Sequence, residues 1–136
     1  MPPELKIAVA VQSDLEVWQK LNATAFAVSG LTSLLPKLLG EPYVDGSGET
    51  YSPMFGLPVL VQTGDHAAIV RAFRRARERG LAMSVFTREL FTTGNDVDNR
   101  AAVRAVGTDD LDVVVFAVAG GAKLVDKAFD RLRWHP

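Results

Sequence analysis

Four apolar runs divide the chain, and each is short enough to be a buried strand. The first run is rich in alanine and valine and has no charged residue. The runs occupy residues 7–11, 59–62, 81–87 and 111–119. Segments with helical periodicity lie between them. Strands that alternate with helices predict an α/β layer structure.

The first helix is predicted to follow a turn at residues 12–14. Ser13 or Asp14 can accept hydrogen bonds from the first N–H groups of that helix. Few charges follow until Pro36, near which the helix is expected to fray. The pattern predicts a helix that packs closely on the sheet, with Lys20 as the cation of its first two turns.

The second helix is predicted at residues 66–79, with Asp65 as its cap and Gly80 as its stop. Two further helices are predicted at 96–106 and 123–132. Apolar residues at positions i, i+3, i+4 and i+7 of the second helix predict its buried stripe, which comprises Ile69, Ala72, Phe73 and Ala76.

The segment 40–58 has the pattern of a hairpin. Asp45-Gly46-Ser47-Gly48 is a strong turn signal between two short arms, 43–44 and 50–51. Both arms carry a tyrosine. We therefore expect a small flap that lies over the body of a single domain spanning residues 1–136.

Composition narrows the class of protein. The chain has 136 residues, of which 48% are hydrophobic, enough for one domain with a core. A formal net charge of -1 produces no global field that recruits nucleic acid or an anionic membrane. The absence of cysteine excludes disulfides, thiolate zinc sites and a cysteine nucleophile. Without a signal-peptide pattern or a membrane-length apolar run, the expected location is cytoplasmic.

Lys20 is the first candidate for chemistry. A lysine at the mouth of a strand-to-helix turn faces the crevice where open α/β sheets bind ligands. There it could neutralise a phosphate or polarise an ester carbonyl. The alternative is a solvated lysine that pairs with Glu16 four residues earlier.

Two segments resemble the peptidyl-tRNA hydrolase II group. They are KIAVAVQSDLEVWQKLN at the start of the chain and VVVFAVAGGAKLVDKAFDRLRWH at its end. With the further cues GEPY and ELFTTGND, the chain is most similar to an uncharacterised bacterial family, the domain of unknown function numbered two thousand. The resemblance implies a three-layer α/β/α fold with a four-stranded mixed sheet, and leaves a homodimer open. It implies no reaction.

The chain departs from that hydrolase group at the residues that carry its chemistry. The group has the pattern Lys-x-x-x-Gln-x-x-His on its first helix, whereas this chain has Lys20, Thr24 and Ala27. The group also places an aspartate just after its third strand, where Glu89 is the nearest carboxylate here. Glu89 could substitute for it, or could be the first-turn acid of a short helix. These differences argue against peptidyl-tRNA hydrolysis.

Aromatic residues of the first helix and the flap could form a ligand pocket. Asn22 could orient a ligand there through its amide. The alternative is that Trp18 and Phe55 are core residues that anchor the flap. The pocket residues would be Trp18, Tyr43, Tyr51, Met54 and Phe55.

Three arginines, Arg71, Arg75 and Arg79, are spaced to form a ridge on the second helix. The ridge could hold RNA phosphates, but a solvated helix face is the simpler interpretation, so nucleic acid is an unfavoured partner. Gly120-Gly121-Ala122-Lys123 could bind an anion near the crevice, or could simply allow a tight turn.

No pattern predicts a metal or cofactor. The acidic run 95–99 lacks the spacing of a calcium loop and is better explained by helix capping through Asn95 or Asp96. His66 and His135 are too few for a metal site.

Two functional hypotheses follow. In the first, the protein is a small-molecule-binding domain without peptidyl-tRNA hydrolase activity. In the second, it is a diverged hydrolase acting on peptidyl-tRNA or another ester- or nucleotide-linked substrate, with Lys20 and Glu89 in catalytic roles. The missing histidine and displaced carboxylate favour the first. The expected ligand contacts are Asp14, Trp18, Asn22, Thr24, Tyr43, Tyr51, Thr87 and Lys123.

Overall fold

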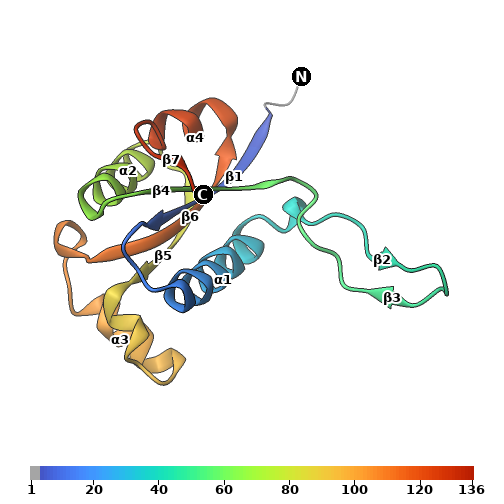
Figure 1. Ribbon diagram of the computed structural model, residues 1–136, viewed down its shortest axis with the longest axis horizontal. Coiled ribbons are helices and arrows are strands. Elements are labelled where there is room, and N and C mark those ends of the chain that lie inside the picture. The colour runs from blue at the N-terminus through green and yellow to red at the C-terminus, as the bar shows by residue number, and fades with distance from the viewer. Residues whose placement is uncertain (1–3) are drawn as a thin grey trace.

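Five strands form the central sheet of the computed structural model, which describes residues 4–136 (Figure 1). Their order across the sheet is β5-β6-β1-β4-β7. β1 pairs parallel to β4 and antiparallel to β6, and β6 pairs antiparallel to β5, so β1, β4 and β5 run in one direction. Their bounds are β1 Leu5–Gln12, β4 Val59–Gly64, β5 Ala82–Thr87, β6 Val113–Gly121 and β7 Arg133–Trp134.

The prediction of a four-stranded sheet is wrong, because the end of the chain adds a fifth strand. The last helix, α4, spans Ala122–Ala128 and not residues 123–132. Arg131 adopts a positive φ of 75°, which a helix cannot continue. The chain therefore turns back, and β7 pairs antiparallel with Gln62 and Thr63 of β4.

Helices cover both faces of the sheet (Figure 1). α1, Val17–Leu34, packs on the face that includes Ile7 and Val9 of β1. α2, His66–Glu78, and α4 pack on the opposite face, which includes Ala8 and Ala10. This alternation follows the twofold period of strand side chains. α3, Asp96–Arg104, lies beside the 3₁₀ helix η2, Arg88–Phe91.

Besides the early end of α4, the main departure from the predicted helix boundaries is at the start of α1. Glu16, not Ser13 or Asp14, precedes its first turn, in a capping box in which Gln19 Oε1 accepts from the Glu16 N–H at 3.0 Å. The helix begins later than expected because Leu15 is buried and Asp14 is bonded to Gln12. None of the helices within residues 4–136 is long and apolar enough to span a bilayer.

The other predicted caps are confirmed. Asp65 accepts from the Ala68 N–H at 2.8 Å, and Asn95 accepts from the Asp98 N–H at 2.9 Å. Gly80 follows α2 with a φ of +65°, which glycine adopts without steric cost. The predicted apolar stripe of α2 is buried.

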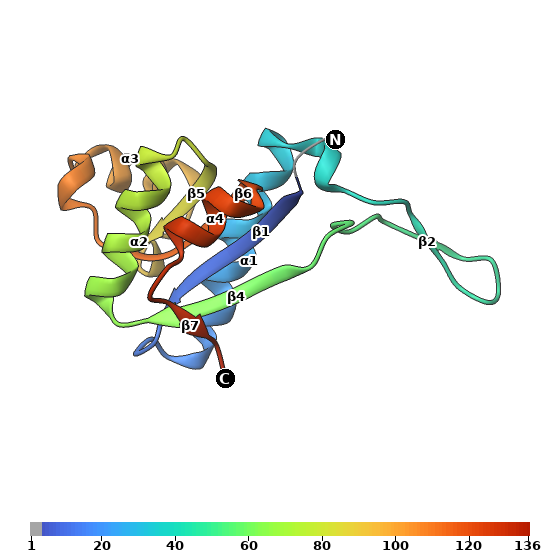
Figure 2. The same ribbon diagram turned by 90° about the horizontal axis from the view of Figure 1, so that it is seen from above.

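The predicted hairpin is confirmed, but its predicted position is wrong. β2, Tyr43–Val44, pairs antiparallel with β3, Thr50–Tyr51. Residues 40–55, here called the arm, project away from the body and do not lie over it (Figure 2). Hydrogen bonds at the base set this direction, from Gly40 N–H to Met54 O at 2.8 Å and from Gly56 N–H to Leu38 O at 2.7 Å.

Candidate functional site at the carboxyl edge of the sheet

Three parallel strands end at the same edge of the sheet, and polar residues gather there. β1 leads into α1 on one face, whereas β4 leads into α2 on the other. Neighbouring strands whose connections leave to opposite faces mark the usual ligand position in α/β sheets. Six residues, here called the carboxyl-edge cluster, lie at these strand ends: Gln12, Asp14, His66, Thr87, Arg88 and Asp112.

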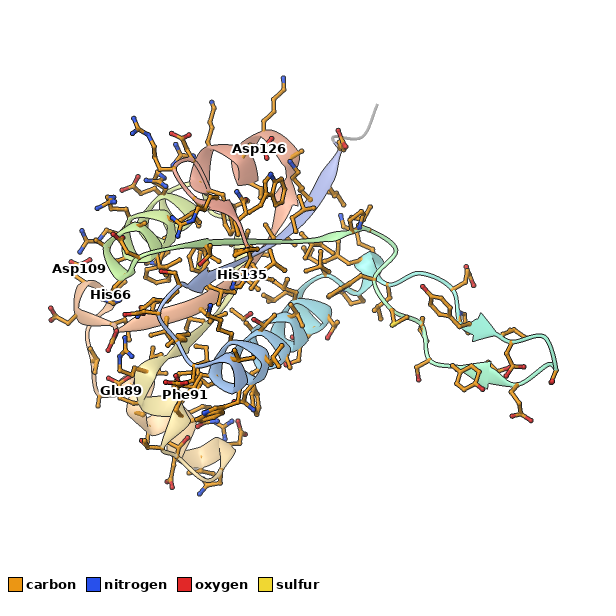
Figure 3. The ribbon with its side chains drawn as sticks, in the orientation of Figure 1. His66, Glu89, Phe91, Asp109, Asp126 and His135 are labelled. Atoms are coloured by element: carbon orange, nitrogen blue, oxygen red, sulfur yellow. The ribbon has the colours of Figure 1, made fainter. Side chains whose placement is uncertain are left out.

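Gln12 links two other members of the cluster. It is the last residue of β1 and only 2% exposed. Its Nε2 donates to Asp14 Oδ1 at 2.6 Å, and its Oε1 lies 2.8 Å from Nδ1 of His66. Figure 3 labels His66 at the start of α2. Because the amide nitrogen is used by Asp14, its oxygen accepts from the His66 Nδ1–H. The neutral imidazole then carries its lone pair on Nε2.

Asp112 joins the histidine to an arginine. It lies just before β6, whose start adjoins the end of β5 because the two strands are antiparallel. Arg88 Nε donates to Asp112 Oδ2 at 2.9 Å, and the Arg88 N–H donates to Asp112 O at 3.0 Å. Asp112 Oδ1 is 3.7 Å from His66 Nδ1, which is too long for a hydrogen bond but places the carboxylate next to the ring.

Two oxygen atoms of the cluster are buried without a hydrogen-bond partner among the described residues. They are Thr87 Oγ1 and Asp112 Oδ1. Buried polar atoms are nearly always bonded, to protein, water or a ligand. These two therefore mark the inner side of the cluster as the place where an added polar group would be stabilised.

The outer side of the cluster is open. The side chains of His66 and Arg88 are both 48% exposed. The amide of Gln12, by donating to Asp14, lowers the pKa of that carboxyl below its usual value. The cluster thus presents an imidazole, a guanidinium and a carboxylate that stays ionised, all reachable by a ligand.

The predicted contacts Asp14 and Thr87 belong to this cluster. The candidate catalytic residue Glu89 follows it, exposed in the first turn of η2. Its carbonyl accepts from the N–H and the hydroxyl of Thr92. Glu89 is therefore the first-turn acid of a short helix, as the alternative interpretation expected.

Lys20 does not meet Glu89. Its Nζ lies 3.2 Å from Nε2 of His135, near the end of the chain, and not against Glu16. Trp18, two residues earlier, packs edge to face on Phe91 of η2, with ring centroids 5.6 Å apart. Two residues rotate a helix by about 200°, so Lys20 and η2 lie on opposite flanks of α1.

The aromatic pocket that the sequence suggested forms only in part: Tyr43, Met54 and Phe55 line a hollow of about 220 Å³ at the base of the arm, without Trp18 or Tyr51. Tyr43 and Tyr51 face each other across the hairpin, both exposed, and the Tyr51 hydroxyl donates to Asp45 Oδ2 at 2.9 Å. Of the two residues that the alternative interpretation placed in the core, Phe55 packs against it at the base of the arm, whereas Trp18 is 58% exposed. Of the remaining predicted contacts on α1, Asn22 is exposed and Thr24 is half-buried.

Lys123 lies at the opposite end of the sheet. The end of β6 pairs with the start of β1, where Gly121 is opposite Leu5. Lys123 would lie near the crevice if β6 ran parallel to β1. Because β6 runs antiparallel to β1, its end lies at the other edge of the sheet, and the expectation for Lys123 is wrong. Lys123 is exposed there, at the start of α4.

The arginine ridge is not three solvated cations. Arg75 Nε donates to the carbonyl of Ala128, the last residue of α4, at 3.0 Å. A terminal nitrogen of Arg75 donates to the carbonyl of Asp130, just after the helix, at 2.5 Å. Burial lowers the pKa of Arg75. Arg79 donates to Arg75 O, while Arg71 is exposed. Two of the three side chains therefore serve the fold.

Sequence reasoning missed Gln12, His66, Arg88 and Asp112. Each stands at or next to the end or start of a strand, which is the signal that could have found them. His66 was weighed only as a metal ligand, and Asp112 was assigned to the interior of a strand. Within residues 4–136, no three His, Asp or Glu side chains lie close enough together to hold a metal ion.

Comparisons with known proteins agree on a family without an assigned activity. A solved structure of the protein of unknown function Atu0240 from Agrobacterium tumefaciens strain C58 is 38% identical, with a TM-score of 0.93 over 97% of this chain and 98% of that one. No protein of curated function matches. Residues 5–136 match the family described as Protein of unknown function (DUF2000), and the chain belongs to that family.

Proposed function

We propose that this protein is a ligand-binding domain of the peptidyl-tRNA hydrolase II-like superfamily that lacks peptidyl-tRNA hydrolase activity. Its ligand is a small anionic molecule bound at the carboxyl-edge cluster, without a cofactor. The observation that carries the proposal is the hydrogen-bonded chain from Asp14 through Gln12 to His66, with Asp112 and Arg88 beside it.

The cluster offers complementary groups to such a ligand. Arg88 donates from Nε to Asp112, and among residues 4–136 no hydrogen bond or ion pair engages its two terminal nitrogens. Those nitrogens suit a carboxylate or a phosphate. His66 Nε2 can accept a hydrogen bond from a ligand hydroxyl, since Nδ1 is held by Gln12. An anionic group and a hydroxyl are thus the two features that the ligand needs.

The position of Ala27 supports the absence of peptidyl-tRNA hydrolysis. The hydrolase group that this chain resembles has a histidine there. Ala27 is 2% exposed, and its carbonyl accepts from the hydroxyl of Ser84 on β5. This part of α1 packs on the sheet and does not face solvent, so α1 offers a substrate no group at this position.

The test is a titration followed by NMR, with inorganic phosphate and small hydroxycarboxylates as probes. We expect shifts of the His66 ring and the Arg88 guanidinium signals, both lost in the Arg88→Ala variant. Arg74→Ala, which changes an exposed arginine on α2, is the matched control and should retain them. Shifts confined to other regions, or none with any probe, would contradict the proposal.

A second candidate function is hydrolysis of an ester-linked substrate, with His66 as general base. The observation in its favour is that, among residues 4–136, no group bonds to His66 Nε2, while the Asp112 carboxylate lies 3.7 Å from Nδ1 of the same ring. Such an imidazole can take a proton from attacking water. His66→Gln should then abolish cleavage of an N-blocked aminoacyl-tRNA or a simple activated ester. Lys20→Ala tests the residue singled out by the sequence. If the intact protein cleaves neither substrate, hydrolysis is contradicted, and ligand binding is the one function that still stands.

A further inference from the structure

The arm carries apolar side chains that the rest of its own chain does not cover. Tyr43, Val44, Tyr51 and Met54 are all more than half exposed. Figures 1 and 2 show the arm extending from the body, next to the end of α1. Only its base, at Leu39 and Phe55, is tied to the body.

α1 carries large apolar side chains on its outer face as well as its inner face, with the uncharged Asn22 and Ser29 exposed among them. Ala23, Ala27 and Leu31 are buried against the sheet, whereas Val17, Leu21 and Phe26 are all more than half exposed. Large apolar side chains that gather on an exposed surface mark an interaction site. A groove of about 500 Å³ continues this surface from Phe26 toward α3.

The total accessible surface is larger than that of a closed monomer. A compact protein of 14.7 kDa exposes about 6,900 Å². This chain exposes 8332 Å², about a fifth more. A standard interface covers about 800 Å² on each partner, so the excess is large enough for one.

Charge favours a second copy as the occupant. In a two-fold interface, residues near the axis meet their own counterparts, so a charged face would repel itself. α1 has one charged residue, Lys20, and that side chain is turned toward His135, off the outer face. Ala25 is exposed, near the middle of the helix, with Leu21 and Ser29 one turn away on either side.

We propose that two copies of this chain pack α1 against α1 about a two-fold axis near Ala25. Each arm clasps the other copy, which covers its tyrosines and valine. The arrangement buries the outer face of α1 and the arm of both copies at once, and neither surface is satisfied within one chain. It is independent of the ligand proposed for the carboxyl edge.

The oligomeric state tests the proposal by sedimentation of the full chain. The intact protein should be a dimer, and Ala25→Arg should make it a folded monomer, because two guanidinium groups would meet at the axis. Leu124→Arg, an exposed site on the opposite face of the sheet, is the matched control and should remain dimeric. A monomeric intact protein at every concentration would overturn the proposal.

A second variant tests the arm. Replacing residues 41–53 with Asn-Gly closes the hairpin at the pair formed by Gly40 and Met54, so the base of the arm is retained. We expect the dissociation constant of the dimer to rise about tenfold or more. An unchanged dissociation constant would show that the arm contacts no partner, and would overturn that part.

A single introduced cysteine tests the axis directly, since the natural chain has none. Ala25→Cys should form a disulfide between two copies under mild oxidation, because residues at the axis are adjacent. Leu124→Cys should not. A dimer in which Cys at 124 cross-links and Cys at 25 does not would place the interface on the other face of the sheet.

Discussion

The carboxyl-edge cluster and the arm both expose side chains, but they are held in different ways. Gln12 and His66, from two distant segments, share a hydrogen bond, and Asp112 from a third segment lies 3.7 Å from the His66 ring. In the arm, Asp45 accepts from Ser47, Glu49 and Tyr51, all within six residues of it. The cluster exists only once the sheet has formed, whereas the arm is a local structure. Changes at the cluster should therefore cost stability, and changes at the arm should cost little.

The largest effect is expected for Gln12→Ala. The change leaves a cavity at a site that is 2% exposed and removes the partner of both Asp14 and His66. We expect a loss of about 2–3 kcal/mol in the free energy of unfolding, measured in urea. Glu49→Ala on the arm is the counterpart and should change it by less than about 0.5 kcal/mol. An equal loss of unfolding free energy in Gln12→Ala and Glu49→Ala would contradict the difference in support between the cluster and the arm.

Two neighbouring arginines of α2 extend the comparison outside both regions. Arg75 bonds carbonyl groups from a distant segment, as the cluster residues do, while Arg74 is exposed. We expect Arg75→Ala to cost about 2 kcal/mol in unfolding free energy and Arg74→Ala less than about 0.5. The contrast fails if Arg74→Ala is as destabilising as Arg75→Ala.

The smallest effects are expected in the titration of one carboxyl from each region. The Gln12 amide lowers the pKa of Asp14, and the Tyr51 hydroxyl lowers the pKa of Asp45. Because both pKa values lie below those of the unfolded chain, each group stabilises the fold at neutral pH, and that contribution is lost as pH falls through the folded pKa. Carboxyl NMR signals should show the Asp14 pKa rising in Gln12→Ala and the Asp45 pKa rising in Tyr51→Phe.

The same two variants also show whether each hydrogen bond stabilises only its own segment or the whole fold. Tyr51→Phe should raise the pKa of Asp45 without a measurable change in the thermal midpoint, because the hydroxyl bonds only within its own hairpin. Gln12→Ala should change both the pKa of Asp14 and the thermal midpoint. A midpoint shift in Tyr51→Phe as large as that in Gln12→Ala would mean that the arm is coupled to the body.

The sequence predicted two of the six cluster residues and missed the other four. Asp14 and Thr87 were expected to contact a ligand, and both lie in the cluster. Their partners were missed because Gln12, His66 and Asp112 are separated by about fifty residues each, and nothing local links them. Lys20, which its position after the first strand predicted to face the crevice, lies beside His135 in the fold.

Local patterns in the sequence account for the elements: the apolar runs became strands, Asp65 and Asn95 capped helices, and the turn at 45–48 closed a hairpin. These depend on backbone preferences and hydrogen bonds between residues close in the chain. The direction of β6, the fifth strand and the course of the arm were set by contacts between distant parts of the chain. The local patterns fit a parallel and an antiparallel β6 equally well, and pairing with β1 and β5 selects the antiparallel one. Because of that direction, Asp112 lies at the carboxyl edge and Lys123 lies at the opposite end of the sheet.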